Sequence, residues 1–143
     1  MKTVIQRVLS AKLEVGGELI SEIGKGLVCY LGVGKGDTKA EAEFFAKKLA
    51  NMRIFEDDNG KMNFSALSLE LEVLLVSQFT LYADTSHGNR PSFTGAESPA
   101  EANELYEFTA SQLRELGLSV KQGVFGANMK INQINDGPVT III

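Results

Sequence analysis

Two short segments bring together residue types that could do chemistry. Ser77-Gln78-Phe79-Thr80-Leu81 follows a very apolar run, and Asn135-Asp136-Gly137-Pro138-Val139-Thr140 precedes one. Both place small polar groups and exposed backbone at the ends of predicted strands. Where a strand ends, successive N–H groups are free to hydrogen-bond a carbonyl oxygen as it becomes an oxyanion. Gln78 adds an amide, and Ser77 and Thr80 add hydroxyls.

Most familiar hydrolase machinery is excluded because the chain has one histidine, His87, and one cysteine, Cys29. His87 lies in a polar loop, where a solvated side chain is favoured over a Ser–His–acid arrangement. Cys29 lies in an apolar run, which predicts a buried, unreactive thiol. One cysteine and one histidine make no disulfide and no compact zinc cluster, so we predict no metal and no cofactor. An enzyme of this composition would act through backbone geometry and groups of its substrate.

The residues alone leave the role of both segments open. The polar side chains from Ser77 to Thr80 could instead satisfy the backbone at the end of a strand. Gly137-Pro138 could be an ordinary turn, since only about 5–6% of X–Pro bonds in folded proteins are cis. Its position before an apolar strand would nevertheless hold its carbonyl groups rigidly, and rigid carbonyls can form a recognition wall.

Two other segments do not match the motifs that they approach. Gly32-Val33-Gly34-Lys35-Gly36-Asp37 lacks the third glycine of a dinucleotide fingerprint, and its lysine is not followed by the Ser or Thr of a P-loop. We interpret this segment as a turn before a helix. Asp57-Asp58-Asn59-Gly60 lacks the later ligands of a calcium loop.

The hydrophobic pattern predicts an α+β fold, with a mostly antiparallel sheet and two main helices in one domain over residues 1–143. Strands are expected over residues 2–15, 18–23, 26–33, 71–79 and 139–143, with a hairpin over 53–63. The apolar run at 26–33 predicts burial on both faces. The apolar strand at 139–143 should be paired and covered, either within the domain or by a second subunit.

Helix boundaries carry their own signals. Thr38 begins a capping box and a helix over 38–52, and Ser98 with Glu101 predicts a second capping box and a helix that stops at Gly117. The polar connection between the 71–79 strand and this second helix has about 16 residues, which exceeds the usual length and indicates function.

Composition sets broad limits on partners and location. The chain has 143 residues, 44% of them apolar and 22% charged, with a net charge of −4. No apolar run approaches the roughly 20 residues that span a bilayer, so we expect a cytoplasmic protein with no membrane partner. The negative charge argues against a broad nucleic-acid groove but leaves an RNA partner open.

Taken together, these segments resemble the D-aminoacyl-tRNA deacylases, the D-tyrosyl-tRNA(Tyr) deacylase family. The shared motifs occur in family order across nearly the whole chain: Ile5-Gln6-Arg7-Val8, Arg53-Ile54-Phe55, Gly60-Lys61-Met62-Asn63, Ser77-Gln78-Phe79-Thr80-Leu81, Arg90-Pro91-Ser92-Phe93, Phe125-Gly126-Ala127-Asn128-Met129 and Asn135-Asp136-Gly137-Pro138-Val139-Thr140. Ala11-Lys12-Leu13-Glu14-Val15 departs from a more usual small, β-branched stretch, away from the expected site.

The resemblance implies a barrel-like core and a homodimer that hydrolyses the ester between a D-amino acid and the terminal ribose of tRNA. It implies no DNA partner. In the family the Gly-Pro bond is cis and reaches into the pocket of the other subunit. The residues so implied are Ser77, Gln78, Phe79 and Thr80 beneath the ester, Gly137 and Pro138 as a chiral screen, and Gln6, Phe125 and Met129 near the terminal adenosine.

Such a screen works by exclusion. If the ammonium and ester carbonyl are fixed, inverting the α-carbon exchanges its hydrogen with its side chain. A wall of backbone oxygens that fits only hydrogen then rejects every L-residue, while the D side chain points to solvent. Glycine has two hydrogens and passes this wall, which predicts hydrolysis of glycine mischarged on tRNA(Ala). Replacing Pro138 is expected to admit L-substrates.

The catalytic step has two interpretations. Thr80 could be a nucleophile, but no residue is identified that would deprotonate it. We prefer the alternative, in which the 2′-hydroxyl of the ribose assists attack while the Phe79 and Thr80 amides hold the oxyanion. Two other function classes compete with this prediction. One is a non-enzymatic dimeric RNA-binding protein on the same fold, and the other is a small-molecule amidase or esterase using Thr80.

Overall fold

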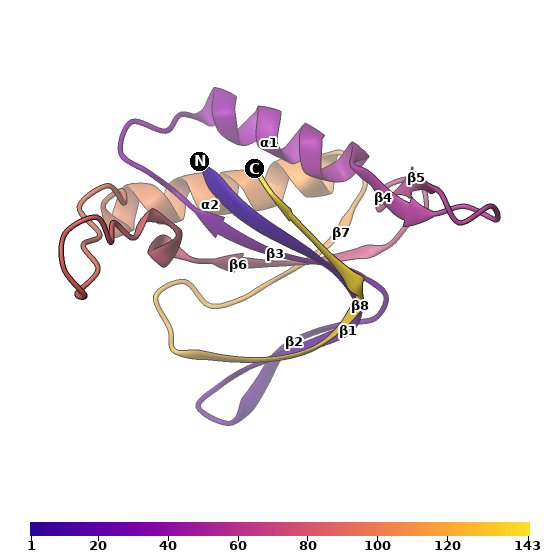
Figure 1. Cartoon of the computed structure of the whole chain (residues 1–143), viewed down its shortest axis with the longest axis horizontal. Coiled ribbons are helices and arrows are strands. Elements are labelled where there is room, and N and C mark those ends of the chain that lie inside the picture. The colour runs from indigo at the N-terminus through magenta and orange to yellow at the C-terminus, as the bar shows by residue number, and fades with distance from the viewer.

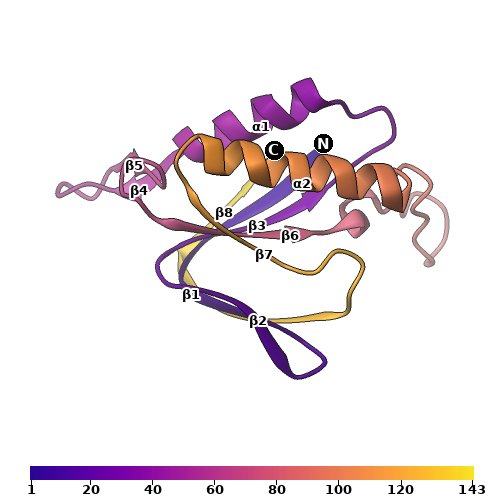
Figure 2. The same cartoon turned by 180° about the vertical axis from the view of Figure 1, so that it is seen from behind.

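The computed structural model describes residues 1–143 as a curled sheet with two helices packed against one face (Figures 1 and 2). The strands are β1 (Lys2–Val15), β2 (Glu18–Ile23), β3 (Gly26–Gly32), β4 (Arg53–Glu56), β5 (Met62–Ser65), β6 (Glu72–Ser77), β7 (Ser119–Gln122) and β8 (Met129–Ile142). The helices are α1 (Lys39–Asn51), α2 (Pro99–Glu115) and the short 3₁₀ helix η1 (Phe79–Tyr82). The expected α+β fold with two main helices is confirmed.

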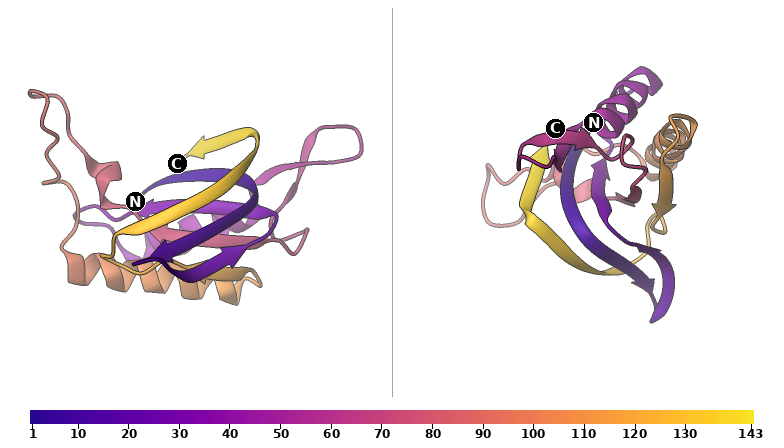
Figure 3. Two further views of the ribbon diagram at one scale, coloured as in Figure 1. Left: turned by 90° about the horizontal axis from the view of Figure 1, so that it is seen from below. Right: turned by 90° about the vertical axis from the view of Figure 1, so that its right-hand side faces the viewer.

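The main sheet has the order β2-β1-β3-β6-β7, and β8 pairs with β1 alone. Pairs that involve β1 are antiparallel, whereas β3–β6 and β6–β7 are parallel. The long β1 pairs with β3 through its first half, with β2 through its second half and with β8 along most of its length. The lower parts of β1, β2 and β8 therefore curl beneath β3 and β6, which gives the sheet its barrel-like form (Figure 3).

This curl produces a core on each side of β3 and β6. Alternate residues of a strand face opposite sides of a sheet. Leu27, Cys29 and Leu31 of β3 pack beneath the helices, whereas Val28 packs with Leu74 of β6 in the curled part of the sheet. The predicted burial of β3 on both faces is confirmed, and Cys29 is fully buried.

The two helix starts differ from one another. Thr38 accepts a hydrogen bond from the Glu41 N–H (3.4 Å), and the Glu41 carboxylate accepts one from the Thr38 N–H (2.8 Å), so the first capping box is confirmed. The second capping box is wrong. Glu97 accepts the Ser98 N–H (2.7 Å) in place of Glu101, and the Ser98 hydroxyl donates to the Glu101 carboxylate (2.8 Å).

The strand expected over 71–79 ends earlier than its apolar pattern predicts. Strand β6 stops at Ser77, and the Gln78 N–H donates to the Leu31 carbonyl (2.8 Å) at the end of β3. From Phe79 the chain then turns into η1, which places the following residues at the edge of the sheet.

The structure also bears on membranes and metals. Neither α1 nor α2 has the length and apolar character needed to cross a bilayer. No group of three or more His, Cys, Asp or Glu side chains is arranged to hold a metal ion.

Candidate active site

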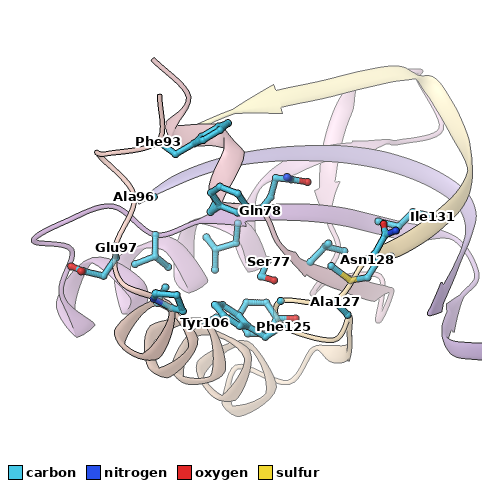
Figure 4. Close-up of a pocket in the computed structure, with 18 residues that line it drawn as sticks. Ser77, Gln78, Phe93, Ala96, Glu97, Tyr106, Phe125, Ala127, Asn128 and Ile131 are labelled. Carbon is cyan, nitrogen blue, oxygen red and sulfur yellow. The ribbon is translucent and has the colours of Figure 1, made fainter. Parts of the chain in front are cut away.

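A pocket of about 590 Å³ lies where β6 gives way to η1 (Figure 4). Its walls also come from residues 93–97, the first turn of α2 and the segment that enters β8. Of the 18 residues that line it, 12 are hydrophobic. A concave, mostly apolar cavity with a few polar groups is the usual form of a small-molecule site.

Three residues of the Ser77-Gln78-Phe79-Thr80 motif line this pocket: Ser77, Gln78 and Phe79. Thr80 is exposed and does not line it. The Thr80 hydroxyl accepts a hydrogen bond from the Gln78 side-chain amide and has no other side-chain partner. An amide donor cannot remove a proton, so this chain supplies no general base to Thr80.

The backbone of η1 is available for binding at its start. Phe79 and Thr80 are the first two residues of this helix, where N–H groups have no intrahelical acceptor. These two residues follow β6 closely, and Ser77 at the end of β6 and Phe79 both line the pocket. The arrangement can therefore offer two adjacent backbone donors to an oxygen atom, as the sequence predicts for an oxyanion.

Tyr82 fixes the position of η1. Its hydroxyl donates to the Asp37 carboxylate (3.3 Å), which also accepts the Gly34 N–H (2.6 Å). A Cβ atom on Gly34 would lie 2.4 Å from the Tyr82 ring, so the ring requires a glycine there. Burial, together with the Asp37 charge, raises the pKa of Tyr82 to about 12. The glycine-rich segment thus provides room for the tyrosine that holds η1.

Aromatic side chains form the wall opposite η1. The rings of Tyr106 and Phe125 lie 6.0 Å apart and both line the pocket, together with Met129. The Tyr106 hydroxyl donates to the Leu75 carbonyl (2.8 Å), and burial raises its pKa to about 12. Tyr106 is not among the residues that the sequence predicts for the site, because nothing in the spacing of a helix distinguishes a pocket-facing aromatic residue from a core one.

Gly137 and Pro138 lie elsewhere. They are exposed on β8, do not line the pocket of their own chain, and are joined by the cis bond that the family resemblance implies. Gly137 has φ +128°, and a Cβ atom there would lie 2.8 Å from the Val139 nitrogen. This position therefore requires glycine.

A buried arginine anchors the residue before Gly137. Arg7 is 5% exposed, and its Nε lies 3.1 Å from the Asp136 carboxylate. Its Nη1 donates to the Ile54 carbonyl (2.7 Å), and its Nη2 lies 3.5 Å from the Glu56 carboxylate. Arg7 has no role among the sequence-based predictions, although an arginine within an otherwise buried strand is a signal that its side chain has partners.

Gln6 also lies outside the pocket of its own chain. Its side-chain amide nitrogen donates to the Thr140 hydroxyl (3.3 Å), and its oxygen accepts a hydrogen bond from Gln133 (2.7 Å). These contacts place Gln6 on the β1–β8 pair, near Gly137 and Pro138 in the sheet and apart from Phe125 and Met129.

Large apolar side chains are exposed on the same two strands. Leu9 of β1 is 51% exposed, and Ile134 and Ile142 of β8 are 59% and 75% exposed. Strand β8 has no second strand partner, so one of its edges is also unpaired. An apolar edge of this kind is normally covered in a native protein.

Comparison with known proteins places this geometry in one family. The chain matches the family described as D-Tyr-tRNA(Tyr) deacylase over residues 4–143. It is 55% identical to the D-aminoacyl-tRNA deacylase of Deinococcus radiodurans, over all of this chain and 99% of that protein. It is 53% identical to the enzyme of that name from Roseiflexus castenholzii, over all of this chain and 91% of that protein.

Two solved structures share the fold. The structure of c-Myc DNA Unwinding Element Binding Protein superposes with a TM-score of 0.93 at 43% identity, over all of this chain and 97% of that one. A probable eukaryotic D-amino acid tRNA deacylase superposes with a TM-score of 0.80 at 17% identity, over 99% of this chain and 97% of that one. The full-length sequence matches place the chain more narrowly than the fold does: it belongs to the D-Tyr-tRNA(Tyr) deacylase family.

Proposed function

We propose that this protein hydrolyses the ester bond between a D-amino acid and the terminal ribose of tRNA, releasing free D-amino acid and tRNA. The observation that carries the proposal is the apolar pocket with Ser77, Gln78 and Phe79 in its wall, in a chain of this family. Aminoacyl-tRNA is the substrate and macromolecular partner, and the cytoplasm, where translation uses it, is the place of action.

The active unit is a homodimer in which Gly137 and Pro138 of one subunit close the pocket of the other. Two features support this arrangement. Gly137 and Pro138 are exposed and lie outside the pocket of their own chain. Strand β8, which carries them, exposes Ile134 and Ile142, and its neighbour β1 exposes Leu9; a second subunit would cover these side chains. Backbone oxygens of the Gly-Pro segment then form the wall that excludes L-residues.

The terminal adenosine lies against the aromatic wall of the pocket. Phe125 and Met129 offer the apolar surface on which a base can stack, and the Tyr106 ring extends it. Gln6 belongs to the β1–β8 pair that carries Gly137 and Pro138, so it approaches the pocket of the partner subunit and not its own.

Catalysis uses the backbone and the substrate. Water adds to the carbonyl carbon with help from the 2′-hydroxyl of the ribose, and the N–H groups of Phe79 and Thr80 stabilise the negative charge that forms on the carbonyl oxygen. The bond from that carbon to the 3′-oxygen then breaks, and the proton that the water loses passes to the 3′-oxygen. Thr80 does not act as the nucleophile, because its only side-chain partner is the Gln78 amide N–H, which cannot accept the proton that the hydroxyl would have to lose.

The proposal is tested by deacylation of D-tyrosyl-tRNA and L-tyrosyl-tRNA, with glycyl-tRNA alongside. Rapid release from the D-ester and from glycine, with the L-ester spared, is the expected result because the wall excludes by size at one position of the α-carbon. Equal hydrolysis of the D- and L-esters would reject the chiral screen. Absence of hydrolysis together with tRNA binding would favour a non-enzymatic RNA-binding role.

A further inference from the structure

The connection between η1 and α2 contains a closed loop at residues 84–92. The N–H of Asp84 donates to the Ser92 carbonyl (2.7 Å), and the N–H of Ser92 donates back to the Asp84 carbonyl (2.9 Å). Every residue of this 84–92 loop is exposed. The loop projects beyond the sheet at the end of the molecule where η1 lies (Figures 1 and 3).

The chain that follows the loop is part of the pocket wall. Phe93, Ala96 and Glu97 line the pocket. The Phe93 ring lies edge-on to the Phe79 ring, with 5.1 Å between their centroids. The Glu97 N–H donates to the Val33 carbonyl (3.0 Å), which ties this stretch to the end of β3. The 84–92 loop is therefore held at a fixed place on the rim of the pocket.

The charge in the loop is uncompensated at Arg90. Arg90 is exposed and forms none of the ion pairs of the structure. The only carboxylate in the loop, Asp84, lies at its base and accepts the Ser86 N–H (2.9 Å). Hydrogen bonds from Ser86 lower the pKa of Asp84. In a chain with a net charge of −4, a free guanidinium in the loop that leads into the pocket wall is a favourable site for an anion.

The proposed substrate brings such an anion to this rim. When the terminal ribose lies in the pocket, the preceding nucleotides of the single-stranded 3′ end must pass over its edge. Phe79, which is 57% exposed, lies at this edge with Phe93. Aromatic side chains beside a cationic group are the usual combination at single-strand sites, because bases stack while the cation binds the backbone.

We propose that the 84–92 loop holds the single-stranded 3′ end of tRNA, with Arg90 bound to a backbone phosphate; this rests on the deacylase function proposed above. The contact contributes to binding of every tRNA that carries the common single-stranded end. It is independent of the amino acid, because Arg90 lies outside the pocket that receives the ester.

The test compares two substrates with the same reacting ester. D-tyrosyl-tRNA carries the phosphates, whereas the D-tyrosyl ester of adenosine carries none. Arg90→Ala should raise KM for D-tyrosyl-tRNA about tenfold at low salt, the effect of losing one charge-assisted hydrogen bond. The slope of log kcat/KM against log salt should become shallower by about 0.7. Kinetics with the adenosine ester should not change, and Arg90→Lys should keep the wild-type salt slope.

Lys47→Ala is the matched control. Lys47 is an exposed cation in α1, forms no ion pair and does not line the pocket, so both substrates should react as in the wild type. An Arg90→Ala enzyme with unchanged KM for D-tyrosyl-tRNA would overturn the inference. Arg90 of the wild type would then be a solvent-exposed side chain that does not bind tRNA. An equal fall in kcat/KM with both substrates would also overturn it, because the loop would then support the pocket itself and would not bind the single-stranded 3′ end of tRNA.

Failure of the proposed function gives a different result. The wild-type protein would then hydrolyse neither ester, whatever residue stands at position 90. In that case the inference is tested by measuring, with fluorescence anisotropy, how tightly the protein binds tRNA that carries no amino acid. Weaker binding by Arg90→Ala, but not by Lys47→Ala, would support the phosphate contact, and equal binding by both variants and the wild type would reject it.

Discussion

Ser77, Gln78 and Phe79 lie in the wall of a largely apolar pocket that elements of one chain surround, whereas Gly137 and Pro138 lie in the open on β8. The second region is also held in place, because Arg7 bonds both the backbone and the carboxylate of Asp136, but Gly137 and Pro138 do not line the pocket of their own chain.

In the proposed homodimer, this difference divides selectivity from catalysis. Under that proposal the pocket, which one chain builds, binds the ester and its adenosine. A rigid segment presented outward can act only on what another molecule brings to it. Exposed Leu9, Ile134 and Ile142 on the same strands make a second copy of the chain the natural source of that pocket.

The largest expected effect comes from removing the anchor of the exposed region. Arg7→Ala leaves the Asp136 carboxylate and the Ile54 carbonyl without their buried partner, which should lower the free energy of unfolding by about 3 kcal/mol. Urea denaturation measures this loss. Lys12→Ala is the control, because the Lys12–Glu22 pair is about half exposed and should contribute less than about 1 kcal/mol. Similar losses in both variants would mean that Arg7 is not an anchor.

The next effect concerns selectivity. Gly137→Ala should lower the ratio of D- to L-tyrosyl-tRNA hydrolysis by roughly tenfold, since the added Cβ meets the Val139 backbone and forces the segment to shift. Gly16→Ala is a matched control, because Gly16 also has a positive φ (+61°) but open space around it. If Gly137→Ala left the D/L ratio unchanged, Gly137 and Pro138 would not form the chiral screen.

A smaller effect is expected in the pocket region at Thr80. Thr80→Ala should reduce kcat by less than about tenfold, whereas removal of a true nucleophile reduces it by roughly 10⁴-fold or more. Single-turnover deacylation of D-tyrosyl-tRNA measures this, with thermal unfolding and tRNA binding as controls. Abolished hydrolysis with the fold and binding retained would make Thr80 the nucleophile.

The smallest effect is a pH dependence of stability in the aromatic wall. Burial raises the pKa of Tyr106 from 10.0 to about 12, so its neutral form is favoured in the folded protein. The resulting stability is present below pH 10 and is lost as the pH rises from about 10 to about 12. Tyr106→Phe should weaken this loss of stability at high pH. At neutral pH it should lower the free energy of unfolding by about 1 kcal/mol, because it removes the hydrogen bond to the Leu75 carbonyl. Urea denaturation midpoints of the wild type and Tyr106→Phe, measured from pH 8 upward, check this prediction. An equal fall in both midpoints above pH 10 would contradict it.

The sequence predicts the elements whose signals are local. The strands expected over 2–15 and 18–23 are β1 and β2, and the Thr38 capping box begins α1. The sequence does not predict η1, because the turn depends on the bond from Gln78 to Leu31 and on the space that Gly34 leaves for Tyr82. These partners lie far apart in sequence, and spacing does not reveal them.

The same limit applies to the site. Ser77, Gln78 and Phe79 reach the pocket because they end a buried strand, which the apolar pattern shows. The partners of Arg7 come from β4 and β8, and no local pattern links them. The separation of Gly137 from the pocket of its own chain follows from the path of β8 along β1, and before the structure only the family resemblance implied it.

The central claim, that each active site combines two subunits, is tested most directly with mixed dimers. One subunit carries Ser77→Trp, which fills its pocket, and the other carries Gly137→Ala. The only open pocket then faces an intact Gly137 of the partner subunit. We predict D-tyrosyl-tRNA hydrolysis with the D/L ratio of the wild type. A relaxed ratio, equal to that of the Gly137→Ala homodimer, would place the screen in the same chain as the pocket and contradict the account.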